Sequence, residues 1–244
     1  MLVTVLTVSY NAEATIARTI ESVIAQTYPN IEYIVIDGAS RDNTALIARS
    51  YLDRFNAVTG RSMRVISEPD KGMYDALNKG AKLAHGLIVG QINADDWYEP
   101  DAVQTMAELW EREHYDLAWG SLNVITGSGS FVKHAKRGIL WTTSHWCHPA
   151  AFAERNILLE YPYPLTNSHD DFDFATHVYL DGKKIIPLDK VISNFTFGGM
   201  STQKSFREAK KRLNEIYGIY KKYGMSKFYY LHRLAFETVK YFLV

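Results

Sequence analysis

The sequence predicts an α/β fold in which helices cover both faces of a Rossmann-like, mainly parallel sheet. Four short apolar runs rich in β-branched residues recur along the first hundred residues, at 2–8, 32–37, 63–67 and 87–92. Runs of this length are typical of buried strands. Segments with helical periodicity lie between them, and this alternation is typical of a parallel sheet.

The expected helices are marked by apolar residues that return to one side of a helical turn. In the first helix, Ile16, Ile20 and Ile24 share one face. A second helix is expected over about 43–55, and a third over about 73–84. Each of them would connect two of the parallel strands.

Length and composition place the chain among ordinary globular proteins. It has 244 residues, of which 47% are hydrophobic and 22% are charged. These values exclude a largely disordered chain, a collagen-like fibre and a disulfide-stapled miniprotein. The single cysteine, Cys147, fits a reducing compartment. We find no basic segment typical of a signal peptide and no apolar stretch long enough to span a membrane, so we expect a cytoplasmic protein.

Polar side chains follow each of the four expected strands, in the segments 9–11, 37–44, 68–72 and 93–96. Such residues are also common in ordinary turns. In open parallel sheets, however, ligands bind beyond the carboxyl ends of the strands. Four polar ends in succession therefore predict one ligand-binding crevice.

The middle of the chain is less regular and rich in aromatic residues. It carries His145, Cys147 and His148 close together, followed later by an acidic run at 169–173. The three potential zinc ligands are too close in sequence for a usual tetrahedral site. A zinc centre is therefore not expected.

Five blocks of the sequence, taken in order, resemble family 2 glycosyltransferases with the GT-A fold. The blocks are TVSYNAEATIARTIESVIAQTYPNIEYIVIDGASRDNT, EPDKGMYDALNKGAKLAHGLIVGQINADDWY, HPAAF, DDFDF and FGGMS. The resemblance covers residues 1–203 and implies an inverting enzyme of the bacterial polysaccharide type. We expect a nucleotide-sugar-binding half at 1–100, an acceptor-binding half of the same domain at 101–203, and a helical tail at 204–244.

Asp95 and Asp96 are adjacent carboxylates at the end of a strand. Burying them unpaired would be costly, and a divalent cation such as Mg²⁺ or Mn²⁺ would remove that cost. The resemblance implies that Asp96 holds the metal and that Asp95 lies near the ribose and diphosphate of the donor. The alternative is a turn that caps the following helix.

Asp37 follows a buried strand, where its carboxylate can accept a hydrogen bond from a nucleobase N–H. The resemblance implies that Asp37 binds the uracil of a UDP donor, with Ser9 and Tyr10 close to the base. The alternatives are an Asx turn at Asp37 and a core aromatic at Tyr10.

A second group of donor-binding candidates lies in the block at 68–80. Gly72 allows close approach of a ligand, and the helix that follows favours anions at its N-terminus. Lys71 would meet a phosphate beside Asp70, and the resemblance implies that Asn78 faces the donor. A solvent-exposed turn and an ordinary helix surface are the alternatives.

Glycosyl transfer requires an acceptor hydroxyl to lose its proton as it attacks, and a positioned carboxylate can take that proton. The resemblance places this general base in the acidic block, at Asp171, with Asp170 as the neighbouring candidate on the acceptor side. It also places His148 on the acceptor side. For the acidic block, the alternative is a set of acids in the first turn of a helix, where the helix dipole favours them. For His148, the alternative is a structural histidine.

The segment Gly198–Ser201 is predicted to close over the donor, with a tight turn as the alternative.

The tail that follows is basic and aromatic: residues 201–244 hold ten Lys or Arg and three Glu. Ile216 and Tyr220 lie on one helical face, which is typical of a helix that binds an anionic lipid surface at the inner face of the cell membrane. A helix pair packed on the domain or on a second subunit is the alternative. No nucleic-acid motif accompanies the charge, so nucleic acid is not an expected partner.

The sequence therefore predicts an inverting, metal-dependent glycosyltransferase. It would move a sugar from a nucleotide diphosphate donor, a UDP-sugar, to a hydroxyl of a glycan or lipid-linked acceptor. A non-catalytic nucleotide-sugar-binding or scaffold protein that has kept the fold is the alternative. An NAD-dependent oxidoreductase is excluded because no GxGxxG follows the first strand.

Overall fold

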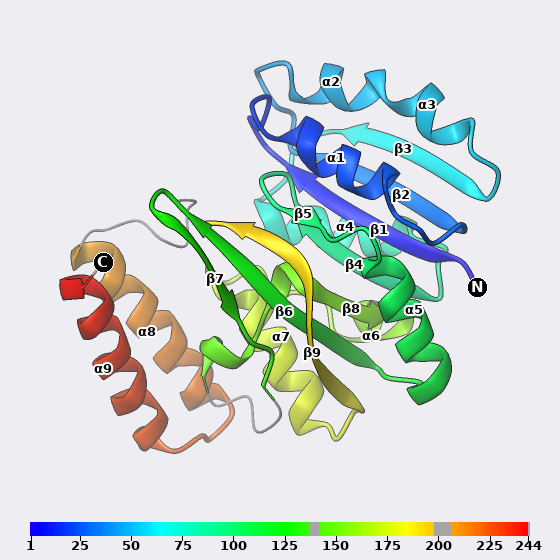
Figure 1. The fold of residues 1–244 in the computed structure, drawn as a ribbon. Coiled ribbons are helices and arrows are strands. Elements are labelled where there is room, and N and C mark those ends of the chain that lie inside the picture. The colour runs from blue at the N-terminus through cyan, green and yellow to red at the C-terminus, as the bar shows by residue number, and fades with distance from the viewer. Residues whose placement is uncertain (137–141, 198–205, 244) are drawn as a thin grey trace.

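The computed structural model describes residues 1–136, 142–197 and 206–243. Within these ranges nine strands form one sheet in the order β3-β2-β1-β4-β8-β6-β9-β5, with β7 paired to β6 (Figure 1). The strands are β1 (Val3–Ser9), β2 (Ile31–Asp37), β3 (Arg61–Ser67), β4 (Ile88–Asn93), β5 (Trp97–Tyr98), β6 (Leu117–Thr126), β7 (Gly129–Lys133), β8 (Ala151–Glu154) and β9 (Ile185–Thr196).

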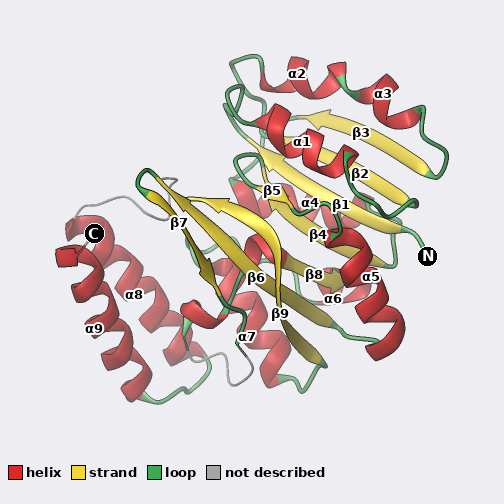
Figure 2. Cartoon of the chain, viewed as in Figure 1, coloured by secondary structure: helices red, strands yellow, loops and turns green. Residues whose placement is uncertain are grey.

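Helices lie on both faces of this sheet (Figure 2). They are α1 (Ile16–Ile24), α2 (Thr44–Ser50), α3 (Leu52–Asn56), α4 (Met73–Leu83), α5 (Ala102–Glu113), α6 (Arg155–Glu160), α7 (Asp170–Leu180), α8 (Phe206–Lys222) and α9 (Lys227–Leu243), with short 3-10 turns at Thr143–His145 and His148–Ala150. The mixed α/β fold with a mainly parallel sheet and a helical tail is confirmed.

The first four strands are all parallel, as their apolar runs predict. Every residue of β1 and β2 is buried, because both strands are covered on two faces. The register pairs Ser9 with Asp37, and Asp37 with Ser67. The carboxyl ends of three strands therefore lie in one row at the edge of the sheet.

The strands of the second half continue the same sheet. β8 runs antiparallel between β4 and β6, whereas β6 and β9 are parallel to each other. The predicted halves 1–100 and 101–203 thus share one sheet through the pairing of β4 with β8.

The helix expected over 43–55 is divided in two. The amide of Tyr51 bonds to the carbonyl of Ala48, three residues back, so the turn tightens there and α3 begins at Leu52. Beyond this break, Phe55 packs against Tyr33 of β2 with ring centroids 5.5 Å apart. Helical periodicity in the sequence does not report the tertiary contact between Phe55 and Tyr33. The sequence therefore predicts one helix over this range.

The tail forms the helix pair α8 and α9, which lie side by side (Figure 1). Ile216, Ile219 and Tyr220 of α8 are buried, and the ring of Tyr220 meets Phe172 of α7 edge-on. The face of α8 that was expected at a lipid surface therefore packs inside the protein, because the rest of the fold offers it an apolar partner. Across the described ranges, no helix combines the length and the hydropathy needed to cross a membrane.

Candidate active site

Asp37 ends β2 in a cage of hydroxyl groups. Its carboxylate accepts hydrogen bonds from Ser9 Oγ at 3.1 Å, Ser67 Oγ at 2.7 Å and the Ser40 amide at 2.9 Å, and also from Ser40 Oγ. Asp37 is fully buried. Its observed role is to tie three segments together at the edge of the sheet, and contact between Asp37 and a nucleobase stays a prediction.

Tyr10 lies on the outside of the same edge. Its side chain is 59% exposed, so the alternative of a core aromatic is wrong. The loop after β3 lies directly beside the loop after β2, because a Cβ on Gly38 would come within 2.5 Å of Asp70 Oδ2. Lys71 is exposed in the same loop. The predicted donor-binding residues of these loops thus gather at one edge.

Asn78 is a correction to the sequence-based prediction. Its Nδ2 donates to the Tyr163 carbonyl at 2.9 Å, and its Oδ1 accepts from the Tyr163 amide at 2.9 Å. Both ends of the side-chain amide therefore fasten α4 to the segment before α7. The polar atoms of the Asn78 side chain are thus bonded to protein backbone.

Asp95 and Asp96 follow β4 at the same sheet edge. Asp96 is fully buried, and its Oδ1 accepts from the Thr196 amide at 3.0 Å. Burial, reinforced by the charge of Asp95, raises the pKa of Asp96 to about 8. Arg18 lies alongside, but its guanidinium donates to the Asp95 carbonyl at 2.7 Å and covers the Trp97 ring at 3.9 Å.

The surroundings of this acidic pair fit a divalent cation. Asn93 Nδ2 lies 3.4 Å from Asp96 Oδ2. Among the residues that the structure describes, the buried Oδ1 of Asn93 has no hydrogen-bond partner. Two carboxylates and an amide oxygen are the hard ligands that Mg²⁺ and Mn²⁺ prefer. The described part of the chain contains no group of three or more His, Cys, Asp or Glu arranged for a metal, so a cation here would share its coordination with substrate or water.

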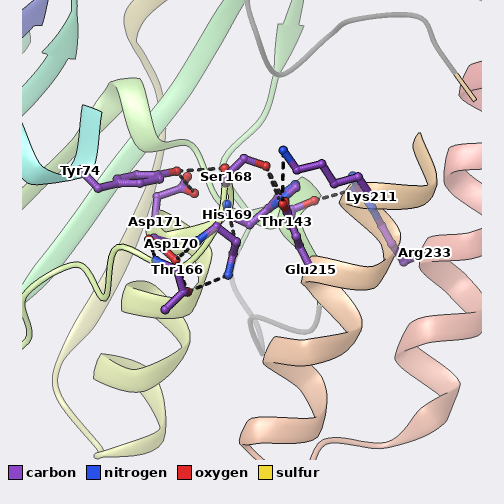
Figure 3. A network of polar contacts seen from close by, with 11 residues as sticks. Tyr74, Thr143, Thr166, Ser168, His169, Asp170, Asp171, Lys211, Glu215 and Arg233 are labelled. Atoms are coloured by element: carbon purple, nitrogen blue, oxygen red, sulfur yellow. Dashed lines mark hydrogen bonds and ion pairs between the residues drawn. The ribbon is translucent and has the colours of Figure 1, made fainter. Parts of the chain in front are cut away.

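Asp171 is held by hydrogen bonds to both carboxylate oxygens. Tyr74 Oη donates to Oδ1 at 2.8 Å, and Trp146 Nε1 donates to Oδ2 at 2.9 Å. The carboxylate is half-buried in the first turn of α7. Figure 3 shows the Tyr74 hydroxyl pointing at Asp171. A part-exposed carboxylate fixed in this way is suited to accept a proton in a defined direction.

The sequence analysis did not single out Tyr74 or Trp146. Tyr74 belongs to the block at 68–80, and Trp146 lies two residues before His148. For Tyr74 the signal was its place within a motif block, and for Trp146 it was only its closeness to the HPAAF block.

Asp170 is a second correction. It is fully buried, and it accepts hydrogen bonds from the Thr166 amide and hydroxyl, both at 2.8 Å, and from the Asn167 amide at 3.1 Å. These bonds satisfy the backbone of the loop before α7. Asp170 therefore shapes that loop, and its carboxylate is closed to solvent.

His148 is buried rather than open to an acceptor. Its Nε2 lies 3.0 Å from Gln91 Oε1, which also accepts from the Tyr163 hydroxyl at 2.5 Å. Burial lowers the pKa of His148, so the ring is neutral near pH 7. His148 lies between Gln91 of β4 and Trp146, the residue that donates to Asp171. The predicted loop at Gly198–Ser201 lies outside the described residues.

The family model described as glycosyl transferase family 2 matches residues 4–170, which is more than half of the chain. This chain belongs to glycosyl transferase family 2. The matched range includes the strand ends that carry Asp37, Asp70 and Asp96. It stops one residue before Asp171, so neither Asp171 nor the tail lies within the matched family region.

Curated relatives include glycosyltransferases from several bacteria. The chain is 24% identical over 236 residues to the Escherichia coli UDP-Glc:alpha-D-GlcNAc-diphosphoundecaprenol beta-1,3-glucosyltransferase WfgD, covering 94% of this chain and 90% of that protein. It is 26% identical over 178 residues to an uncharacterized glycosyltransferase from Nostoc sp., covering 68% of this chain. The match spans 54% of the Nostoc protein, about half of its length.

Solved structures of the same fold include S. aureus TarS residues 1–349 in complex with UDP, with a TM-score of 0.68 and 22% identity over 81% of this chain and 61% of that one. A mannosyltransferase from Pyrobaculum calidifontis, in complex with GDP-Man and Mn²⁺, aligns with a TM-score of 0.67 and 20% identity over 90% of this chain and 63% of that chain. At these identities the likeness establishes the GT-A type of fold.

Proposed function

We propose that this family 2 member is an inverting glycosyltransferase that uses a UDP-sugar donor. The observation that carries the proposal is the Asp171 carboxylate, part-exposed and held at both oxygens by Tyr74 and Trp146. Two similar proteins support UDP as the nucleotide: the UDP-Glc transferase of Escherichia coli, and TarS, which was solved in complex with UDP.

The donor would bind along the edge formed by the ends of β1, β2 and β3. The exposed ring of Tyr10 offers a face for the base, and Asp37, in its cage with Ser9, would accept from a base N–H after exchanging one hydroxyl partner. Asp70 and Lys71 would line the phosphate side of the site, with Asp95 near the ribose and diphosphate.

Asp96, with Asp95 and the Asn93 oxygen beside it, would hold a divalent cation, Mg²⁺ or Mn²⁺. The Mn²⁺ complex of the Pyrobaculum mannosyltransferase supports a divalent metal at this fold. When bound, such a cation stabilises the negative charge on a departing diphosphate. The protein's own part is to keep two carboxylates close together and screened from water.

Asp171 would supply the chemistry on the acceptor side. Its free lone pair takes the proton of the acceptor hydroxyl while that oxygen forms a bond to the anomeric carbon. The bond from the anomeric carbon to the diphosphate oxygen breaks on the opposite face, so the configuration inverts. Tyr74 and Trp146 keep the carboxylate oriented during this step.

The acceptor would be a glycan, free or lipid-linked, met at the cytoplasmic face of the cell membrane. The name of the Escherichia coli relative, which contains diphosphoundecaprenol, supports a lipid-linked acceptor. On this chain, α9 exposes Phe228 by 68% and Leu231 by 58%, three residues apart on one side of the helix. Lys221 and Lys227 are exposed near the turn that joins the two tail helices. Apolar and cationic groups together favour an anionic lipid surface.

A donor screen tests the proposed activity directly. The full chain is incubated with UDP-sugars and GDP-Man, with and without Mn²⁺, and nucleotide release is measured in the presence of a glycan acceptor. We expect UDP release that depends on both the metal and the acceptor. Binding of UDP without turnover on any acceptor would instead favour a non-catalytic sugar-nucleotide-binding protein.

Membrane contact predicts that the intact protein sediments with anionic vesicles at low salt and is released as salt is raised. Phe228→Asp should abolish sedimentation, because a charge replaces the most exposed apolar side chain among those that the structure describes in α9. Leu46→Asp on α2 is the matched control, since Leu46 is also 68% exposed, and it should sediment normally. If the intact protein does not sediment with anionic vesicles at low salt, α9 has no lipid-binding role.

A further inference from the structure

We propose that the tail helices α8 and α9 position the general base. Glu215 holds the segment whose carbonyl contacts the Tyr74 hydroxyl, and Arg233 holds the turn that carries Trp146. The proposal rests on the function proposed above, in which Asp171 is the base. It gives the tail a part in the chemistry that is separate from any contact with lipid.

The first connection runs from α8 to Oδ1 of Asp171. Glu215 Oε2 accepts from Ser168 Oγ at 2.6 Å and lies 3.1 Å from His169 Nδ1. The Ser168 carbonyl is 3.1 Å from the Tyr74 hydroxyl, the same hydroxyl that lies 2.8 Å from Asp171 Oδ1. Figure 3 shows these groups in a continuous line. The Ser168 carbonyl and Asp171 Oδ1 are both acceptors for the single Tyr74 hydroxyl proton. By fixing Ser168, Glu215 therefore sets where the competing carbonyl lies relative to Asp171.

The Glu215 carboxylate is charged at neutral pH. The hydrogen bond from His169 is the main cause that lowers the pKa of Glu215 to about 2, and Ser168 adds to it. The Glu215 side chain is only 13% exposed, so water competes little for the carboxylate. A charged, poorly solvated acceptor makes stronger hydrogen bonds than an exposed neutral one.

The second connection runs from α9 to Oδ2 of Asp171. Arg233 is buried, and its Nη1 donates to Thr143 Oγ1 at 2.5 Å. The Thr143 carbonyl accepts from the Trp146 amide at 3.3 Å, and Trp146 Nε1 donates to Asp171 at 2.9 Å. Trp146 also packs edge-on against Trp119 with centroids 5.1 Å apart. Arg233 therefore steadies the short turn that presents the indole N–H.

Another tail contact offers a comparison, because it anchors the tail without touching either connection. Asp173 of α7 accepts from Lys222 Nζ at 2.7 Å and from the Tyr223 hydroxyl. Neither partner of Asp173 bonds to a segment that donates to Asp171. Loss of this contact should affect stability, whereas loss of Glu215 or Arg233 should affect the orientation of the base.

The test uses the full chain with Glu215→Ala, Glu215→Gln and Arg233→Lys, and with Lys222→Met as the matched control. We expect Glu215→Ala to lower kcat about tenfold with unchanged donor KM, because a misplaced catalytic group slows the reaction without weakening donor binding. Glu215→Gln, which keeps an acceptor for Ser168, and Arg233→Lys, which keeps a donor for Thr143, should retain most of kcat. Lys222→Met should keep normal kcat even where it lowers the melting temperature.

A double-mutant cycle with Asp171→Asn separates positioning from an independent effect. Glu215→Ala should cause no further loss of kcat in the Asp171→Asn background, because no base remains to be positioned. An equal loss in both backgrounds, or an equal loss in Lys222→Met, would overturn the proposal. Normal kcat in Glu215→Ala would also overturn it.

Two outcomes keep the test interpretable. If Glu215→Ala does not fold, Ser168→Ala removes the same hydrogen bond, and the same loss of kcat is expected there. If Asp171→Asn itself retains full turnover, the assignment of the base fails. That result is distinct from failure of the tail proposal, in which Asp171→Asn is inactive and the tail variants are normal.

Discussion

Asp171→Asn is expected to lower turnover by at least about a hundredfold while UDP affinity stays near normal. The amide has the shape of the carboxylate but cannot take a proton, and loss of a general base costs about 10²–10⁴ in rate. Donor affinity should hold because Asp171 of α7 bonds to Tyr74 and Trp146, and none of these three residues is among the proposed donor-binding residues. Calorimetry with UDP and single-turnover transfer rates measure the two quantities separately.

Asp170→Asn is the control for this prediction. Asp170 holds the loop before α7 through three hydrogen bonds, so its replacement should lower the melting temperature and reduce turnover less than Asp171→Asn does. If Asp170→Asn were inactive while Asp171→Asn turned over, the base would be the neighbouring residue. If both turned over normally, the base would lie elsewhere.

Asp96→Asn is expected to abolish transfer and to weaken donor binding, because the buried carboxylate that would hold the cation is lost. Excess chelator should have the same effect on the unchanged protein. Asp101→Asn is the matched control, since Asp101 is a nearby carboxylate that is half-exposed and paired with Lys190 at 2.6 Å. Full activity in excess EDTA would remove the metal from the mechanism.

The same substitution should also stabilise the metal-free protein. The pKa of Asp96 is raised to about 8 in the fold, against an ordinary value of about 3.9 in an unfolded chain. Between these values the folded state binds more protons, so the free energy of unfolding falls as pH rises. In EDTA, the melting temperature of Asp96→Asn should therefore exceed that of the unchanged protein by a margin that grows from pH 5 to pH 8. A constant margin would contradict the raised pKa.

The candidate site shows which site residues can be predicted from the local sequence alone. The acidic pair after β4 was found because strand ends carry a local signal, namely an apolar run followed by carboxylates. Asn78 and Asp170 were predicted from their motif blocks, yet the structure bonds them to the backbone of neighbouring segments. A polar residue in such a block can bind a ligand or the protein's own backbone, and the choice depends on which groups the fold brings near.

The tail makes the same distinction on a larger scale. Its charge and helical periodicity are properties of the sequence, and they predict a helical tail correctly. The burial of Ile216 and Tyr220 depends on the presence of α7 beside them. An amphipathic helix has the same pattern whether its apolar face meets lipid or protein, so the sequence left both open.

The sequence by itself determined the parallel sheet, the order of its first four strands along the chain, the family and the candidate base, because apolar periodicity and short motifs are local features. Only the tertiary structure decided which groups hold that base. Tyr74 lies 97 residues from Asp171 along the chain, and Trp146 lies 25 residues away. Glu215 reaches Ser168 across 47 residues. Contacts at such separations depend on how helices and loops pack in three dimensions, and no period or spacing in a single chain encodes them.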